Sequence, residues 1–321
     1  MSSNRMLLRG AVNLLHNSCC SPSTSRAIEK SEDNYILPGL VRGTVLPGGN
    51  CPSFAALAAV GLTVALAAVA APFRDGRTSV GTDLCRVYTC DQGAIVRGDT
   101  SAKRLALVFT GGSFADGGEH IRAVLKKKRV RASFFFTGDF YRAPELSGLI
   151  RELAADGHYL GPHSDKHLLY CDWNDRGRTL VTREAFRADL EANFREMARF
   201  GVARDRAPYF IPPYEWSNAE IAAWTREMGL VLFDFTPGTS SNADYTTPSM
   251  KGYLSSQAIY DRILAYEKKD PHGLNGFLLL IHIGTDPERT DKLYLKLDGL
   301  LTELERRGYA FVRVDELLKV R

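Results

Sequence analysis

The stretch RLALVFTGGSFADGGEHIRAVLKKKRVRASFFFTG, residues 104–138, places a helical pattern between two short apolar runs. The apolar runs span 104–111 and 132–138, and apolar residues recur at helical spacing between 119 and 130. Short runs that are apolar on both faces are typical of buried parallel strands, because such strands are covered by helices on both sides. The stretch therefore predicts a strand, a helix and a second strand parallel to the first.

The same alternation continues to the end of the chain. We expect further strands at 158–164, 207–214, 230–236, 276–283 and 309–314, and further helices at 144–157, 182–201, 217–229, 256–269 and 292–308. Seven strands alternating with six helices indicate an α/β fold with a parallel sheet inside. Both a closed or nearly closed barrel and an open doubly wound sheet fit this order. The glycine-rich signatures of nucleotide binding do not occur at the first strand.

The amino-terminal part of the chain has a different composition. Residues 43–73 carry no charge, and FAALAAVGLTVALAAVAAP at 54–72 is almost entirely apolar. That length could cross a bilayer, which takes about 20 apolar residues, and it also resembles the apolar part of a signal peptide. We expect residues 1–50 to be poorly ordered and 53–73 to form one apolar helix, as a signal peptide or a membrane anchor.

The remaining chain then divides into a linker and a functional domain. The linker, 74–91, contains Cys85 and Cys90, which could form a local disulfide if the region is exported. We expect the domain at 92–321 to lie outside the cytoplasm, either exported or anchored to the membrane. The formal charge of +4 is small for 321 residues, so nothing in the composition requires a nucleic-acid partner. No feature of the sequence specifies an oligomeric state.

Acidic and histidine side chains recur just after the predicted strands. In barrels of parallel strands, functional side chains gather at the carboxyl ends of the strands. The residues there are Asp116 after the first strand, Asp139 after the second, His163 and His167 after the third, Tyr214 and Glu215 after the fourth, Asp234 and Thr236 at the fifth, and His282 at the sixth. A structural role explains any one of them but explains the set poorly. We therefore expect the functional site at this rim.

Two histidines of this set stand at a spacing that can share one metal ion. His163 and His167 are four residues apart in GPHSDKH. Neutral imidazoles with a carboxylate suit zinc and other first-row ions, and three protein ligands plus water form the usual open catalytic site. His282 follows five apolar residues in FLLLIHIG. It is either a buried core histidine or a general acid.

Four motifs then form a recognisable series. They are ASFFFTG at 132–138, HSDKH at 163–167, IPPYEW at 211–216 and LLLIHIG at 278–284. In order and spacing they resemble the motifs A-T-F-F-x-x-G, H-[ST]-x-x-H, R-P-P-Y and L-x-L-H of the polysaccharide deacetylases of the NodB-homology type, carbohydrate esterase family 4. The resemblance covers the chain from about Gly93 to Val320.

The resemblance implies a distorted (β/α)7 barrel and a metal-dependent removal of N-acetyl or O-acetyl groups from chitin-like, peptidoglycan or xylan polymers. It makes His163 and His167 ligands of a divalent ion, which would be zinc or else Co, Ni or Mn. It makes His282 the catalytic acid, with Asp234 in the neighbourhood of the acid that orients this histidine. The backbone N–H of Tyr214 would help the metal to stabilise the oxyanion.

The chain departs from the family at the first motif, T-F-D-D-G, whose two acids are the base and a metal ligand. Here the segment reads VFTGGSFADGG. One alignment places glycines Gly111 and Gly112 at the two acids. The other places Ala115 at the base and Asp116 at the metal ligand. The arginine of R-P-P-Y is also absent, because Ile211 stands in its place, and losing the base together with its cationic partner avoids an unpaired buried charge.

The missing base has several candidate replacements. Asp116 could bind the metal or act on its water, Glu215 is a second candidate, and Asp139 and Asp165 are weaker ones.

The sequence thus predicts a metal-dependent deacetylase of an acetylated carbohydrate, with His163, His167 and Asp116 as metal ligands. The alternative is a relative that binds carbohydrate without turnover, and a third reading is a hydrolase of some other amide.

Overall fold

The computed structural model describes residues 80–319, and only the backbone of 80–83. The expectations for residues 1–50 and 53–73 therefore lie outside the described residues. Cys85 and Cys90 form the disulfide that the sequence suggested. Within 80–319, no helix is long and apolar enough to cross a membrane.

Seven strands follow one another in the predicted order. Their bounds are β3 Arg104–Gly111, β4 Ser133–Phe136, β5 Tyr159–Pro162, β6 Tyr209–Phe210, β7 Val231–Leu232, β8 Phe277–His282 and β9 Ala310–Val312. A short antiparallel hairpin of β1 Thr89–Asp91 and β2 Ala94–Arg97 precedes them, which the sequence analysis did not predict.

The strands form a five-stranded sheet around β3 and a separate parallel pair, β6 and β7. On one edge of β3, β9 pairs with the first half and β4 with the second half, and β8 pairs along the other edge, all in parallel. Backbone groups join the pair to the larger sheet at both ends. The N–H of Thr236 donates to the carbonyl of Leu278, and the N–H of Tyr209 donates to the hydroxyl of Tyr159. The strands therefore curl into a barrel rather than an open sheet.

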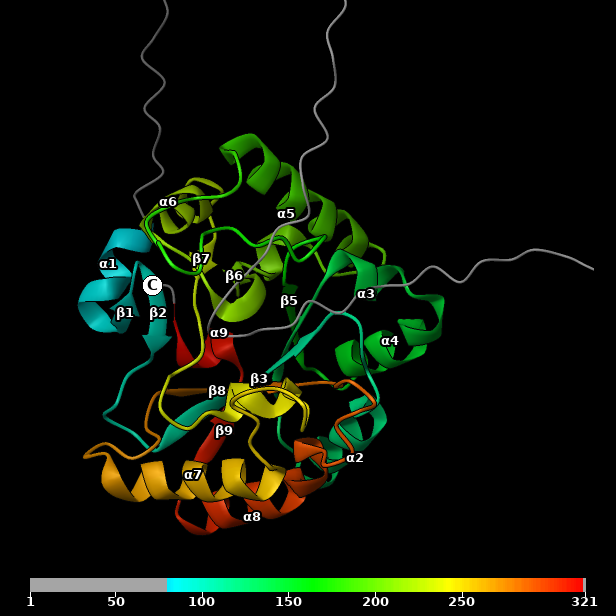
Figure 1. Ribbon diagram of the computed structural model, residues 1–321, viewed down its shortest axis with the longest axis vertical. Helices are drawn as coiled ribbons and strands as arrows, with labels where there is room; N and C mark the ends of the chain where they lie inside the picture. Colours follow the sequence, from blue (N-terminus) through cyan, green and yellow to red (C-terminus); the bar gives the residue numbers. More distant parts are fainter. Residues whose placement is uncertain (1–79, 320–321) are drawn as a thin grey trace, which may run out of the picture. The chain divides into compact units, whose positions relative to one another are not determined.

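Helices surround these strands (Figure 1). The α-helices are α1 Val80–Val87, α2 Gly118–Lys128, α3 Gly138–Arg142, α4 Ser147–Ala155, α5 Arg183–Ala198, α6 Ala219–Glu227, α7 Ser256–Lys269, α8 Leu297–Arg306 and α9 Val314–Leu317. The 3-10 turns are η1 Pro144–Leu146, η2 Arg204–Arg206, η3 Pro213–Glu215, η4 Ser241–Tyr245 and η5 Leu293–Lys296. The six predicted helices correspond to α2, α4, α5, α6, α7 and α8, and α7 and α8 lie side by side (Figure 1), joined by the ion pair of Arg307 with Glu267.

The strand predicted at 207–214 is reduced to two residues, and prolines explain this. Pro208 precedes β6, and Pro212 and Pro213 follow it closely. Proline has no N–H to donate to a neighbouring strand, so the ladder ends there. Strand pairing therefore ends at Phe210, and the chain continues into the turn η3 at the rim of the barrel.

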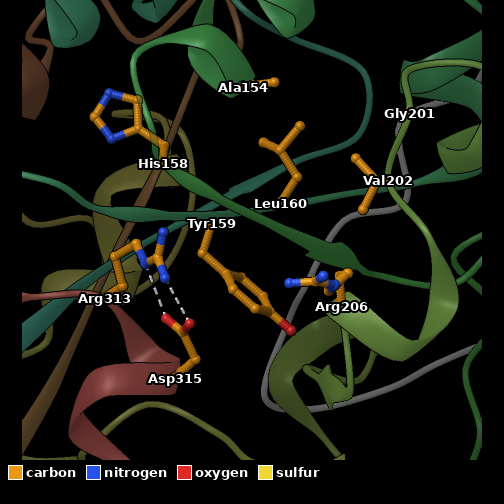
Figure 2. A pocket seen from close by; sticks show the side chains of 9 residues that line it. All are labelled: Ala154, His158, Tyr159, Leu160, Gly201, Val202, Arg206, Arg313 and Asp315. Carbon is orange, nitrogen blue, oxygen red and sulfur yellow. Dashed lines mark hydrogen bonds and ion pairs between the residues drawn. The ribbon is translucent and has the colours of Figure 1, made fainter.

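A cavity of about 330 Å³ opens beside β5, away from the carboxyl end of that strand. Figure 2 shows it lined by His158, Tyr159 and Leu160 from the start of β5, together with Arg206 and Arg313. None of its lining residues belongs to the predicted functional set.

Candidate active site

His163 follows β5 directly and is held in one orientation. Its side chain is buried, and its N–H donates to the side-chain oxygen of Asn193 at 3.0 Å. Its Nδ1 lies 3.0 Å from the carbonyl oxygen of Ile211, which can only accept, so Nδ1 carries the proton. Burial lowers the pKa of His163 to about 4, although the Ile211 carbonyl opposes this shift. The ring is therefore neutral, with the Nε2 lone pair turned toward the site.

His167 meets His163 through a tight loop. Ser164 and His167 both have positive φ, of 68° and 54°, and the Ser164 hydroxyl accepts the His167 N–H at 2.8 Å. This loop brings the two Nε2 atoms to 3.2 Å from one another. Two nitrogen ligands of one tetrahedral zinc ion, each bound at about 2.0–2.1 Å, are separated by about 3.4 Å. The pair therefore fits two positions of a metal site, and the Nδ1 contact of His163 is of the kind that orients such ligands.

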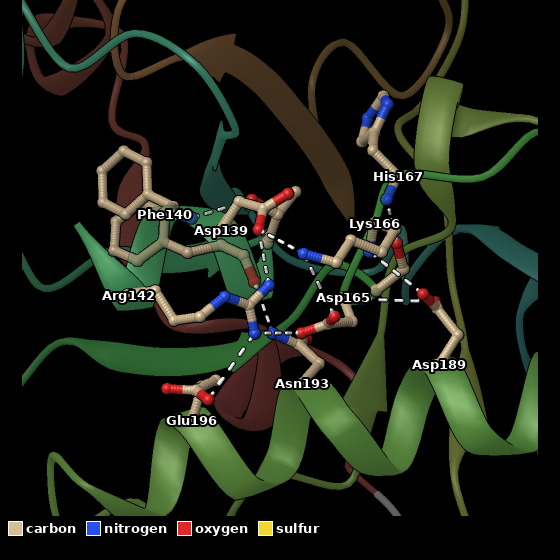
Figure 3. Close-up of polar contacts among 12 residues, drawn as sticks. Asp139, Phe140, Arg142, Asp165, Lys166, His167, Asp189, Asn193 and Glu196 are labelled. Atoms are coloured by element: carbon tan, nitrogen blue, oxygen red, sulfur yellow. Dashed lines mark hydrogen bonds and ion pairs between the residues drawn. The ribbon is translucent and has the colours of Figure 1, made fainter.

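Helix α5 holds this loop from behind. Figure 3 shows Asp189 and Asn193 projecting from α5 toward it. The Asp189 carboxylate accepts the N–H groups of Asp165 and Lys166 at 3.2 and 3.0 Å, and the Tyr170 hydroxyl at 3.0 Å. These contacts fix the backbone between the two histidines.

The two weaker acidic candidates, Asp139 and Asp165, belong to an ion-pair cluster between α3 and the same loop (Figure 3). The Arg142 guanidinium contacts Asp139 at 2.6 Å and Asp165 at 2.7 Å, and Lys166 contacts Asp139 at 2.6 Å. The cluster joins α3 to the histidine loop. Both acids therefore have structural partners, and neither is placed as a base.

His282 ends β8, and its partner is Asp244 rather than Asp234. Asp244 is 1% exposed; one oxygen lies 2.6 Å from His282 Nδ1 and the other accepts the His282 N–H at 3.0 Å. The predicted pairing of Asp234 with His282 is wrong. Sequence reasoning missed Asp244 because it lies in η4, a short turn between β7 and α7 that has no periodic pattern.

Asp234 instead lies buried beside Glu215. One of its oxygens accepts the N–H of Phe235 at 2.7 Å. Burial and then the negative charge of Glu215 raise the pKa of Asp234 well above its ordinary value. Asp234 thus contributes to the surroundings of Glu215 and not to the acid pair.

Asp116 does not join the histidine pair. One oxygen accepts the Thr285 N–H at 2.8 Å, and the other accepts the Tyr294 hydroxyl at 2.8 Å and contacts Lys292 at 3.0 Å. Burial raises the pKa of Asp116, but the hydrogen bonds from Lys292, Tyr294 and Thr285 outweigh it and lower the pKa overall. Within residues 80–319, no three His, Cys, Asp or Glu side chains converge as a metal site. The prediction of Asp116 as the third ligand is therefore wrong for this structure.

The end of β3 decides between the two alignments of the first motif. The strand runs to Gly111, so glycines occupy its exit, and Asp116 follows five residues after Gly111, just before α2. A Cβ atom at Gly111 would lie 2.7 Å from Ile283 and 2.9 Å from both Phe136 and Phe140. A Cβ atom at Gly112 would lie in ordinary contact, 3.6 Å from Thr137. The site therefore lacks both acids at the strand end.

Tyr214 and Glu215 form the turn η3 in an unusual conformation. Both have positive φ, of 60° and 50°, a region that non-glycine residues adopt uncommonly. The Tyr214 ring packs on the His167 ring with centroids 4.4 Å apart. Glu215 is 9% exposed, and its Oε1 lies 3.9 Å from His163 Nε2. The sequence therefore placed both residues correctly at the rim; the role of the Tyr214 N–H stays a prediction.

Aromatic side chains border the histidine pair. The Trp173 ring lies 5.6 Å from the rings of Tyr214 and Trp216, and the Arg176 guanidinium stacks on Trp216 at 4.1 Å. Trp173, Tyr214 and Trp216 are each half-buried, so they combine a packed body with an accessible edge.

Comparison with known sequences gives consistent similarities. Residues 97–233 match the family described as polysaccharide deacetylase. The chain is 25% identical over 226 residues to peptidoglycan-N-acetylmuramic acid deacetylase PdaA of Bacillus subtilis, covering 70% of this chain and 75% of that protein. It is 27% identical over 219 residues to peptidoglycan-N-acetylglucosamine deacetylase PgdA of Listeria monocytogenes, covering 67% of this chain and 39% of that protein.

Comparison with solved structures shows the same barrel. Bacillus subtilis PdaA, a family 4 carbohydrate esterase, aligns with a TM-score of 0.54 at 22% identity, covering 70% of this chain and 84% of that one. A family 4 pseudoenzyme from Bacillus anthracis aligns with a TM-score of 0.56 at 18% identity, covering 72% and 70%. A mutant of a family 4 pseudoenzyme, described as having restored enzymatic activity, aligns with a TM-score of 0.55 at 18% identity, covering 72% and 73%. At these identities the likeness shows the fold, a NodB-type barrel.

Proposed function

Residues 97–233 match the polysaccharide deacetylase family, and on that premise we propose that the chain is a metal-dependent hydrolase that removes N- or O-acetyl groups from a carbohydrate. The observation that carries the proposal is that a histidine pair suited to a metal and a histidine suited to act as an acid lie at the same rim of the barrel. The His163–His167 pair stands after β5, and His282 with Asp244 stands at the end of β8, close enough to lower the pKa of His163.

The histidine pair would hold the metal, which we propose to be zinc, or else Co, Ni or Mn. Such an ion, when bound, polarises an acetyl carbonyl and makes a water molecule nucleophilic near neutral pH. His163 and His167 fit two ligand positions by donor type and by the 3.2 Å separation of their Nε2 atoms. The carboxylate that usually completes such a site is not in place among the described side chains.

The acid half of the reaction falls to His282. Its Nδ1 hydrogen bond to the buried Asp244 fixes the ring and stabilises its protonated form. Nε2 is then the nitrogen that can deliver a proton to the departing amine or alcohol. Asp244 acts here as a positioning residue, because it is buried and both of its oxygens contact His282.

The aromatic border suits a carbohydrate substrate. Trp173, Tyr214 and Trp216 offer apolar faces beside the histidine pair, and sugar rings have apolar faces that can pack on them. PdaA and PgdA are named for acetylated peptidoglycan sugars, and we extend that substrate class to this chain. Such a polymer would place the domain outside the cytoplasm, with 53–73 as signal or anchor.

One observation favours a second function, carbohydrate binding without turnover. Gly111 and Gly112 stand at the exit of β3, and the nearby Asp116 is held by three other partners. A barrel with glycines at the exit of β3 keeps its sugar-binding surface but lacks the usual catalytic base.

The deciding experiment measures acetate released from acetylated oligosaccharides by the full chain, with zinc, after chelation, and in the His282→Ala variant. A deacetylase releases acetate only with metal and loses turnover in His282→Ala. Oligosaccharide binding without acetate release, unaffected by His282→Ala, would establish the second function. Neither release nor sugar binding would refute both.

A further inference from the structure

Any carboxylate of this metal site must come from outside the β3 exit. Gly111 is enclosed by Ile283, Phe136 and Phe140 so closely that a Cβ atom does not fit. Gly112 carries no side chain, and the oxygens of Asp116 are engaged by Thr285, Tyr294 and Lys292. The position that the family's first motif fills with acids is therefore vacated in this chain.

Glu215 lies next to the histidines although its backbone conformation and its burial are both energetically unfavourable. Its φ of 50° follows a φ of 60° at Tyr214, a left-handed conformation that glycine adopts freely and other residues adopt under strain. Its carboxylate is also buried, which is costly for a charged group, and it lies close enough to Asp234 to raise the pKa of that acid. Strained backbone and buried charge at one residue are typical of functional sites.

The same short segment fixes both Glu215 and the ring that faces it. The Ile211 carbonyl holds His163 Nδ1 at 3.0 Å, and four residues later Glu215 Oε1 lies 3.9 Å from His163 Nε2. The Glu215 N–H donates to the Pro212 carbonyl at 3.0 Å, which tightens the turn between them. The carboxylate and the imidazole are thus presented to one another by one rigid turn.

We infer that Glu215 supplies the carboxylate ligand of the divalent metal, beside His163 and His167. Two histidines and one glutamate form an established catalytic zinc set. The 3.9 Å between Glu215 Oε1 and His163 Nε2 exceeds the spacing of two ligands on a tetrahedral ion by about half an ångström. No three such side chains converge within residues 80–319, so the inference requires the glutamate side chain to move toward the histidine pair when the ion binds. The inference rests on the proposed metal-dependent function.

The test compares zinc binding by the full chain and three variants, using calorimetric titration after chelation of bound metal. Glu215→Gln removes the charge at constant shape, and Glu215→Gly removes the side chain at a backbone position that glycine prefers. Asp116→Asn is the matched control, because it makes the same carboxylate-to-amide change at the rival acid. Thermal unfolding of each protein is followed by circular dichroism.

We expect both Glu215 variants to bind zinc at least tenfold more weakly and Asp116→Asn to bind within twofold of the wild type. Glu215→Gly should melt at the same or a higher temperature, so that loss of zinc cannot be ascribed to loss of fold. Equal zinc affinity of the wild type and Glu215→Gln overturns the inference and leaves the proposed function standing. The same holds if Asp116→Asn alone loses most of its zinc affinity. A wild-type chain that binds no zinc overturns the metal-dependent function together with the inference.

Discussion

A carboxylate moved from position 215 to position 112 should rebuild the metal site. The perturbation is the double variant Glu215→Gly with Gly112→Asp, compared with Glu215→Gly alone. Gly112 directly follows β3, and one alignment of the first motif puts the metal-binding acid there. An aspartate at 112 would therefore take over the charge that Glu215 contributes.

The cost of the new side chain follows from the space around each glycine. At Gly112 the added Cβ lies 3.6 Å from its nearest neighbour, Thr137, so stability should change by no more than about 0.5 kcal/mol. At Gly111 the Cβ would meet Ile283 and two phenylalanines at 2.7–2.9 Å, and such overpacking costs about 1–3 kcal/mol. For a domain of this size that is a fall in melting temperature of roughly 2–12 °C.

The assay is zinc titration combined with thermal unfolding. The double variant with Gly112→Asp should recover at least tenfold of the affinity lost in Glu215→Gly, about 1.4 kcal/mol. Gly112→Asn in the same background is the control, because it has the same shape without the charge, and it should recover nothing. Gly111→Asp should lower the melting temperature.

The reasoning is refuted if Gly112→Asp leaves the fold intact and recovers no zinc affinity. It is equally refuted if Gly111→Asp folds stably and recovers the affinity, since the strand end would then be placed differently from the structure.

Three further outcomes are expected. Asp244→Asn should lower the rate of acetate release by roughly 10²–10⁴-fold and leave zinc affinity unchanged, because Asp244 positions the acid His282; an unchanged rate would contradict this role. Burial lowers the pKa of His158 from 6.5 to about 4, and its Nδ1 accepts the N–H of Ala132. The unfolded chain therefore takes up a proton below pH 6.5 that the folded chain does not, so stability falls by about 3 kcal/mol between pH 7 and pH 4. In His158→Gln the loss of unfolding free energy between pH 7 and pH 4, measured by urea unfolding, should be smaller by about 3 kcal/mol. The same loss in the variant and the wild type would exclude His158 as its cause. Trp173→Ala should raise KM for an acetylated oligosaccharide roughly fivefold with kcat unchanged, and a loss confined to kcat would show that Trp173 does not serve binding.

The order of strands and helices was predictable because it depends on local patterns. The helix predicted at 256–269 has the bounds of α7, since its apolar spacing and its Ser255 cap are both local. Strands were predicted less closely where pairing ends for non-local reasons. The strand expected at 230–236 stops at Leu232, because its ladder partner β6 has only two residues, which prolines shorten.

Partnerships within the site were harder to predict than the residues themselves. Asp234 and Asp244 are both acids after the fifth strand, and no local pattern says which one reaches β8. The structure buries Asp234 near Glu215 and folds η4 back so that Asp244 meets His282. Asp116 was misassigned for the same reason, because its three partners come from the segment 285–294, far away in the sequence.

The sequence by itself determined the α/β alternation, the resemblance to a family, and the presence of His163, His167 and His282 at one rim, because periodicity and short motifs are local properties of the chain. The alternation alone left both a barrel and an open sheet possible, the family resemblance favoured the barrel, and backbone contacts of the tertiary structure close it. Only the tertiary structure decided that Asp244 partners His282 and that Glu215 is the acid 3.9 Å from His163. Those outcomes depend on how elements distant in the chain pack together. Packing, burial and backbone strain arise from many residues at once, so no single stretch of sequence carries them.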